Sequence, residues 1–169
     1  MLEIERKFLI SPQDDSWRRE VIKSYPIFQG YFKNGGAEAA SVRIRITGDK
    51  GNLNIKGPGG IGRAEYSYSI PLSDAQDMME RFCGDRVVKK TRYLVPAAEK
   101  GLTWEIDEYH GAFAGHYTAE LEIPSEDTPF TKPAWLGREV TGQAQYLNAA
   151  LANAQRWPDA QNTNGTMPQ

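Results

Sequence analysis

The sequence predicts a mainly β protein of the α+β kind: an eight-stranded antiparallel sheet, closed into a barrel or folded into a sandwich, with a few flanking helices. Three observations lead to this fold class. Short segments alternate apolar and polar residues with the period of a strand, Gly-, Asn- and Asp-rich turns separate them, and 169 residues suffice for one domain with a hydrophobic core.

The expected strands follow one another along most of the chain. Turn signals between them include Asn34-Gly35-Gly36, Asp49-Lys50-Gly51 and the glycine-rich stretch that begins at Gly57. Closely spaced strands of this kind favour antiparallel pairing. The expected strands are residues 2–10, 28–33, 40–48, 52–56, 63–70, 87–95, 102–109 and 117–123.

Helices are expected where the alternation stops. Ser73 and Gln76 have the spacing of a capping box ahead of a helix over residues 75–83, which Gly84 can end. Residues 15–23 form a further candidate helix.

A last helix is expected after Thr141, which can cap it. Its apolar residues recur at helical spacing, as Tyr146, Leu147, Ala150, Leu151 and Ala154. The chain from 158 to 169 has little to bury, so we expect one domain over residues 1–157 and a flexible C-terminal tail over 158–169.

Composition excludes several classes of function. The chain has 20 basic and 22 acidic residues, so its net charge of −2 provides no broad cationic field for nucleic acid or an anionic membrane. The single cysteine, Cys83, cannot form an internal disulfide, and no stretch approaches the roughly 18 apolar residues of a membrane span. We therefore expect a soluble cytoplasmic protein, with the choice between monomer and homodimer left open.

The charges in the expected strands follow an unusual pattern. Strong charges stand at i and i+2 with aliphatic residues between them, as at Arg43 and Arg45 around Ile44. Side chains at i and i+2 of a strand point to the same face, so each group of charges lies on one side. The charged positions are Glu3, Glu5, Glu65, Glu105, Asp107, Glu120 and Glu122 among the acids, and Lys7, Arg43, Arg45, Lys56, Lys90 and Arg92 among the bases.

Two interpretations of this pattern are open. Each charged face could be the solvated side of a β-sandwich, which is the simpler explanation for any single strand. Together, the sorting of basic and acidic groups onto different strands favours a charged binding tunnel. Paired carboxylates at Glu105 with Asp107, and at Glu120 with Glu122, would also repel one another without a cation nearby.

A tunnel lined in this way suits a polyphosphate and a hard cation. Carboxylates on the first and last expected strands offer oxygen ligands to Mg²⁺ or Mn²⁺. Arg and Lys match phosphate oxygens. His110 and His116 are isolated, and Cys83 lies on the apolar side of an expected helix, so water is the simplest nucleophile.

The order of these motifs resembles the CYTH superfamily of triphosphate tunnel metalloenzymes. The resemblance begins with Glu3-Ile4-Glu5-Arg6-Lys7 and covers roughly residues 1–154. Nine elements in the right order are far more specific than a lone Glu-x-Glu-x-Lys. The later elements are Gln29-Gly30-Tyr31, Arg43-Ile44-Arg45, Lys56, Glu65, Lys90-Thr91-Arg92-Tyr93, Glu105-Ile106-Asp107, Glu120-Leu121-Glu122 and Glu139-Val140-Thr141 with Tyr146 and Asn148.

The resemblance implies an eight-stranded antiparallel closed barrel, whose tunnel hydrolyses or cyclises triphosphates with Mg²⁺ or Mn²⁺. Glu3, Glu5 and Glu122, assisted by Glu120, then correspond to the metal ligands. Glu105 corresponds to an accessory carboxylate, as do Glu65 and Asp107. The implied triphosphate cradle is Lys7, Arg43, Arg45, Lys56, Lys90 and Arg92, and the implied catalytic set is Lys7, Arg43, Arg45, Lys90, Glu65 and Asp107.

The short chain with its immediate N-terminal motif is most similar to the bacterial inorganic triphosphatases of that superfamily. The expected function is therefore metal-dependent hydrolysis of inorganic triphosphate, a small-molecule substrate. A class IV adenylate cyclase and a thiamine triphosphatase are the alternative enzymes. The alternative outside enzymes is a module that binds polyphosphate or a nucleotide without turnover.

Overall fold

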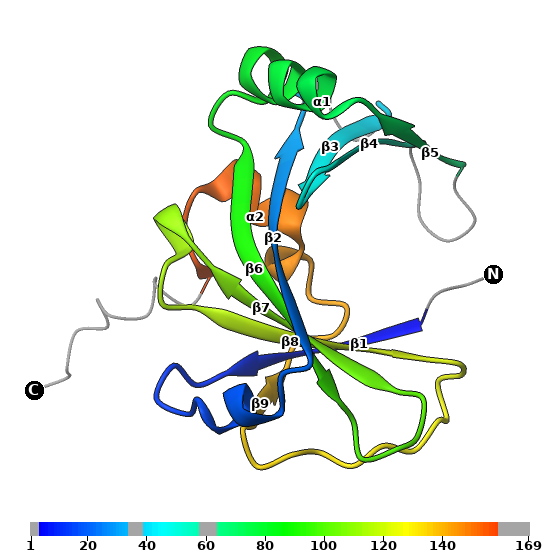
Figure 1. Ribbon diagram of the computed structural model, residues 1–169, viewed down its shortest axis with the longest axis vertical. Coiled ribbons are helices and arrows are strands. Elements are labelled where there is room, and N and C mark those ends of the chain that lie inside the picture. Colours follow the sequence, from blue (N-terminus) through cyan, green and yellow to red (C-terminus); the bar gives the residue numbers. More distant parts are fainter. Residues whose placement is uncertain (1–3, 34–38, 58–63, 159–169) are drawn as a thin grey trace, which may run out of the picture.

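The computed structural model describes residues 4–33, 39–57 and 64–158 (Figure 1). Glu3, most of the expected C-terminal tail, the 34–36 turn and most of the glycine-rich stretch after Gly57 lie outside the described residues. No helix in the described segments is long and apolar enough to cross a membrane.

The described chain forms one antiparallel sheet with a few short helices, which confirms the mainly β class. The strand order is β5-β4-β3-β2-β6-β7-β8-β1-β9. The strands are β1 (Ile4–Ile10), β2 (Lys23–Tyr31), β3 (Ser41–Thr47), β4 (Lys50–Lys56), β5 (Glu65–Ile70), β6 (Val87–Pro96), β7 (Thr103–Tyr109), β8 (Tyr117–Ile123) and β9 (Leu136–Glu139).

The sheet differs from the expected barrel in strand number and closure. It has nine strands rather than eight, and within the described residues no hydrogen-bonded ladder joins the two edge strands, β5 and β9. The additional strand, β9, is only four residues long and has no alternation that a sequence pattern could reveal. It lies against β1 at Gly137, where a Cβ atom would come within 2.6 Å of the Leu9 carbonyl oxygen.

Strong curvature gives the sheet one concave and one convex side (Figure 1). The strands β3, β4 and β5 curve over one end, while β1 and β8 form the opposite end. On the convex side, α1 (Leu72–Met78) and the π turn η2 (Met79–Cys83) pack on the sheet. Ala75 of α1 is fully buried in a cluster with Ile44 and Ile46, which anchors this end of the sheet.

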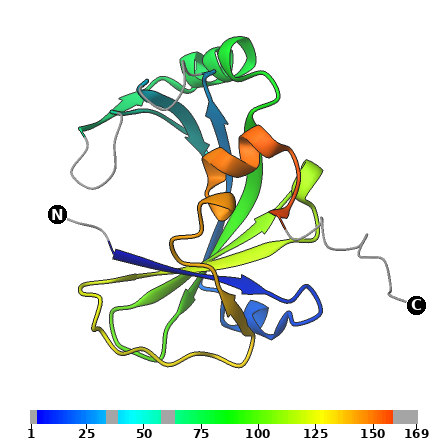
Figure 2. The same cartoon turned by 180° about the vertical axis from the view of Figure 1, so that it is seen from behind.

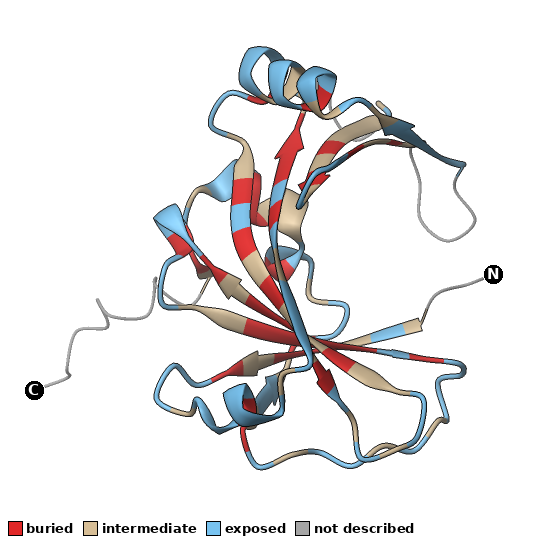
Figure 3. Cartoon of the chain, viewed as in Figure 1, coloured by how far each residue is buried: buried red, intermediate tan, exposed pale blue. Residues whose placement is uncertain are grey.

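A larger apolar core lies on the convex side of the sheet, at the end that β1 and β8 form. Phe8 of β1 and Trp104 of β7 make an edge-to-face contact with their ring centroids 5.8 Å apart. Trp17, on the 3₁₀ turn η1 (Ser16–Glu20), is buried in the same cluster. Buried positions run along the strands in the centre of the sheet, whereas β5 is exposed (Figure 3). The strands that carry the predicted charges are therefore supported by a packed apolar core on their other face.

The C-terminal helix α2 (Asn148–Ala154) lies across β2 and β6, as the view from behind shows (Figure 2). Leu151 of α2 packs in a buried cluster with Tyr31, Val88 and Tyr109, which come from β2, β6 and β7. These three side chains are on the same sheet face as the predicted charges, because Tyr31 is paired with Arg43 and Tyr109 with Lys90. The helix therefore covers one part of the charged face with apolar packing.

Both expected helix caps are wrong. Helix α1 begins at Leu72 after Pro71, without a side-chain cap, and the Ser73 hydroxyl bonds to Asp74 instead of capping. Thr141 lies seven residues before α2, and its hydroxyl accepts a hydrogen bond from the Lys7 backbone N–H at 2.9 Å. The tertiary contact with β1 therefore replaces the local cap. Short 3₁₀ turns, η3 (Gly111–Phe113) and η4 (Ala144–Tyr146), complete the fold, and η4 includes the Tyr146 expected in the helix.

Candidate active site

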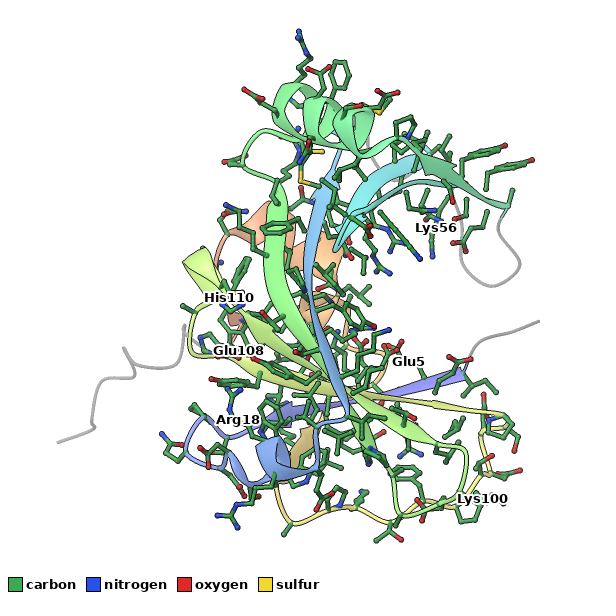
Figure 4. The ribbon with its side chains drawn as sticks, viewed as in Figure 1. Glu5, Arg18, Lys56, Lys100, Glu108 and His110 are labelled. Atoms are coloured by element: carbon green, nitrogen blue, oxygen red, sulfur yellow. The ribbon has the colours of Figure 1, made fainter. Side chains whose placement is uncertain are left out.

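The strand register brings the predicted charges onto one face of the sheet. Residues directly opposite one another in an antiparallel pair project to the same side. Glu5 is paired with Glu122, and Lys56 with Glu65. In Figure 4, Glu5 of β1 and Lys56 of β4 extend toward each other across the concave side. The remaining pairs on this face include Lys7 with Glu120, Glu105 with Glu120, Arg92 with Asp107, and Arg43 with Asn54.

Asp107 is the centre of a buried ion cluster. Its carboxylate accepts hydrogen bonds from Lys90 Nζ at 2.5 Å and from Arg92 Nε at 2.7 Å. Burial alone would raise the pKa of Asp107, but the two cations lower it well below its ordinary value. Burial also lowers the pKa of Lys90 to about 8, against the attraction of Asp107. Asp107 is therefore committed to holding two cations in place.

Glu120 bridges two cations in the same way. It accepts from Lys7 Nζ at 2.8 Å and from Arg92 Nη2 at 2.9 Å. Glu105, on the neighbouring strand, forms a further ion pair with Arg92. Three of the six predicted bases, Lys7, Lys90 and Arg92, are thus each neutralised in part by acids from β7 and β8.

The end of the face near β5 carries a smaller ion pair. Lys56 Nζ lies 3.3 Å from a carboxylate oxygen of Glu65, and both side chains are partly exposed. The Asn54 amide nitrogen donates to Glu65 at 2.9 Å, which lowers the pKa of that carboxyl. Asn54 is only 3% exposed. The lining of this face therefore includes a buried uncharged residue, whereas the charge pattern of the sequence indicated charged residues only.

Arg43 and Arg45 differ from the other predicted bases. Within the described residues neither has an ion pair with a carboxylate. Arg45 is instead held by the buried Gln29. Arg43 Nε and the Oδ1 atom of its opposite neighbour Asn54 are buried without a hydrogen-bond partner in the described structure. This end of the face therefore retains positive charge and unused hydrogen-bonding capacity.

The carboxylates predicted to bind metal divide into two kinds. Glu120 is engaged by cations, whereas Glu5 and Glu122 form no hydrogen bond or ion pair within the described residues. Partial desolvation and the nearby Glu120 carboxylate raise the pKa of Glu5. Two opposed carboxylates that have no other partner in the described part of the chain are a donor set that suits a hard divalent cation. The described residues contain no group of three or more metal-ligating side chains, and Glu3 is not among them.

The residues that the charge pattern missed are mostly neutral. Gln29 and Asn54 have the same strand parity as the charges, and Gln29 also stands in the Gln29-Gly30-Tyr31 element of the family resemblance. Thr141 and Glu139 form a clasp beside Lys7: the Thr141 hydroxyl contacts both the Lys7 backbone and the Glu139 carboxylate. Arg6, on the opposite side of β1 from Lys7, holds Glu139 through two hydrogen bonds of 2.5 and 2.8 Å.

A separate groove lies on the convex side of the sheet. It has a volume of about 700 Å³ and is lined mainly by apolar residues, among them Phe28, Ile46, Leu72 and Met79. None of the predicted site residues lines it. The charged chemistry of this protein is therefore on the concave face and not in the groove.

The chain matches known proteins over most of its length. The CYTH domain profile matches residues 1–154. The chain is 42% identical over 150 residues to the inorganic triphosphatase of Acetivibrio thermocellus, covering 88% of this chain and 92% of that protein. It is 33% identical over 154 residues to the inorganic triphosphatase of Nitrosomonas europaea, covering 90% and 97%.

The fold is also shared with a solved triphosphatase structure. The crystal structure of the inorganic triphosphatase NE1496 matches with a TM-score of 0.70 and 30% identity, covering 90% of this chain and 95% of that one. The curved antiparallel sheet of this chain is thus of the class found in a solved inorganic triphosphatase. This chain belongs to the CYTH family.

Proposed function

We propose that this protein hydrolyses inorganic triphosphate to pyrophosphate and orthophosphate on the concave face, with Mg²⁺ or Mn²⁺ as cofactor. The observation that carries the proposal is the register, which brings six basic and several acidic side chains from seven strands to one face. The two relatives named inorganic triphosphatase support the substrate.

The described residues have separate parts in this proposal. Arg43 and Arg45 bind phosphate oxygens, since their guanidinium groups have no competing carboxylate in the described structure and match phosphate in geometry. Lys56 extends the same cradle toward the edge of the sheet. Lys7, Lys90 and Arg92 form its other wall and are held in place by Asp107 and Glu120.

Glu5 and Glu122, with Glu3 and Glu120, are the proposed ligands of the cation. When bound, Mg²⁺ or Mn²⁺ supplies positive charge that offsets the negative charge of the phosphoryl oxygens. Water attacks the terminal phosphorus as the P–O bond to the bridging oxygen breaks. The orthophosphate that forms takes the oxygen and the protons of the water, and the bridging oxygen leaves in pyrophosphate. Oriented cations stabilise the charge that develops on the transferred phosphoryl group and on the departing pyrophosphate.

A substrate panel tests this function. Purified protein is incubated with triphosphate, ATP or thiamine triphosphate, each with Mg²⁺, Mn²⁺ or a chelator, and orthophosphate and cyclic AMP are measured. We expect metal-dependent orthophosphate release with the highest kcat/KM for inorganic triphosphate. Formation of cyclic AMP from ATP would make the protein a cyclase, and tight binding of triphosphate without turnover would make it a binding module.

We further propose a cytoplasmic location, which the single buried Cys83 supports because the chain relies on no disulfide.

A further inference from the structure

Positive charge on the concave face is compensated unevenly. Lys7, Lys90 and Arg92 contact buried carboxylates at 2.9 Å or less, and Lys56 contacts Glu65 at 3.3 Å. The two arginines of β3 lack such a partner in the described part of the chain. Because a carboxylate would compete with a phosphate for the same guanidinium donors, the way in which these arginines are held matters for binding an anion.

Gln29 of β2 is the residue that holds Arg45. Its side-chain oxygen accepts from Arg45 Nε at 2.9 Å and from Arg45 Nη2 at 2.8 Å. Only the oxygen of an amide can accept both donors, so these contacts also fix which way the amide points. Its nitrogen is thereby directed to the Tyr31 hydroxyl, to which it donates at 2.5 Å.

These contacts leave the Gln29 side chain little freedom. Gln29 is 0% exposed and lies directly opposite Arg45 in the β2–β3 ladder. Two donors of one guanidinium on a single oxygen define the plane of that group. Arg45 is therefore oriented by a buried neighbour on the sheet, while no acceptor among the described residues takes its remaining N–H groups.

The neutrality of this anchor has an electrostatic consequence. Desolvation and the positive charge of Arg43 lower the pKa of Arg45 to about 10, so the site holds a cation under strain from a like charge. A carboxylate at position 29 would relieve that strain and satisfy the same two donors. An amide keeps the geometry and leaves the positive charge uncompensated.

We propose that Gln29 is a positioning residue that orients Arg45 for the triphosphate while leaving the Arg45 charge free to attract it. The proposal rests on the proposed function, because it assigns Arg45 to a polyanionic substrate. It distinguishes two roles for buried partners on this face. Asp107 and Glu120 stabilise the basic side chains that they contact but also neutralise part of their positive charge. Gln29 holds Arg45 in place without neutralising it, so the charge of Arg45 is used in binding.

The decisive variant is Gln29→Glu, which keeps the size of the side chain and both acceptor contacts with Arg45. We expect the melting temperature to stay the same or rise, since a charged acceptor binds a guanidinium more strongly. We expect KM for triphosphate to rise by about tenfold or more, as for loss of one charge-assisted contact, and its dependence on salt to weaken. The matched control is Gln76→Glu, which adds the same charge at an exposed position of α1 and should leave KM unchanged.

If Gln29 had only a structural role, Gln29→Glu would fold and leave KM for triphosphate unchanged. If Gln29→Glu is at least as stable as the wild type and has an unchanged KM, the neutrality of residue 29 has no role and the proposal is overturned. The variant Gln29→Met removes the anchor without adding charge and serves if Gln29→Glu does not fold. We expect it to lower kcat/KM by about tenfold; unchanged kinetics there would overturn the positioning role.

A binding measurement separates this proposal from the proposed function. Triphosphate with Ca²⁺ is titrated calorimetrically into the wild type and Gln29→Glu. If the wild type binds triphosphate but does not hydrolyse it, the proposed function fails, and weaker binding by Gln29→Glu still supports the role of Gln29. Equal binding by the two proteins would contradict that role, as would failure of the wild type to bind triphosphate.

Discussion

Arg92 and Lys90 share one buried carboxylate, that of Asp107, which lies 2.5 Å from Lys90 Nζ and 2.7 Å from Arg92 Nε. The three side chains come from adjacent strands, β6 and β7, and Asp107 is directly opposite Arg92 in their ladder. The carboxylate keeps two like charges close together on the concave face. Its contribution is therefore mainly to the stability and geometry of the cradle.

Replacement of Asp107 by Asn should destabilise the fold strongly. Removing one member of a buried ion pair leaves uncompensated charge, at a cost of about 3–5 kcal/mol. Urea unfolding of wild type and Asp107→Asn measures this difference, with Asp127→Asn in an exposed loop as the control. A loss below about 1 kcal/mol, within the range of an exposed pair, would show that the cluster is not a buried network.

Glu5→Gln should raise the concentration of Mg²⁺ or Mn²⁺ needed for half-maximal activity by about tenfold to a hundredfold, because a charged ligand becomes a neutral one. The fold should be unaffected, since Glu5 has no ion pair within the described residues. Titration of activity with metal measures the shift, and Glu80→Gln on the convex side is the control. An unchanged metal requirement would remove Glu5 from the proposed ligand set.

Arg43→Lys should not restore full activity, although it preserves the charge. Lysine cannot present two donors in the fixed plane of a guanidinium, so we expect kcat/KM to fall by about tenfold or more. Whether KM or kcat changes will show whether Arg43 binds the ground state or the developing charge. Arg19→Lys at an exposed position is the control. Wild-type kinetics in Arg43→Lys would exclude bidentate binding.

Acid should weaken the ion pair between Arg6 and Glu139. The hydrogen bonds from Arg6 lower the pKa of Glu139 from 4.5 to about 2. A carboxyl whose folded-state pKa is depressed contributes stability above its unfolded pKa, and this contribution is lost as the pH falls from about 4.5 toward 2. Urea midpoints at pH 6 and pH 3 should therefore differ less in Glu139→Gln than in the wild type. The same pH dependence in both proteins would contradict the assignment.

Triphosphate should stabilise the protein more than orthophosphate does. At about one hundred times Kd, a ligand that binds only the folded state adds roughly 2.7 kcal/mol, which raises the melting temperature by several degrees. Orthophosphate has a single phosphate group, so we expect it to contact fewer of the basic side chains at once. Thermal melts with Ca²⁺ in place of an activating metal compare the two anions. Equal shifts would indicate that the charged strands do not act as one binding face.

Local alternation of apolar and polar residues predicts most of the strands. The alternation around Arg43-Ile44-Arg45 predicts both a strand and the face of its charges, because the period of side chains in a strand is two regardless of tertiary context. The same alternation predicts the strands around Lys90 and Glu120. Local alternation does not predict the short strand β9 or the position of α2. Gly137 of β9 and Thr141, which was expected to cap the helix, are explained instead by their contacts with β1.

The sequence by itself therefore determined which side chains share a face within each strand, and through its ordered motifs the family. Only the tertiary structure decided which charges meet across strands. Register brings Asp107 to Arg92 and Gln29 to Arg45, and no local pattern encodes a pairing between segments far apart in the chain. Neutral partners such as Gln29 carry no charge signal, so their role emerges only when burial and hydrogen bonding show what they hold.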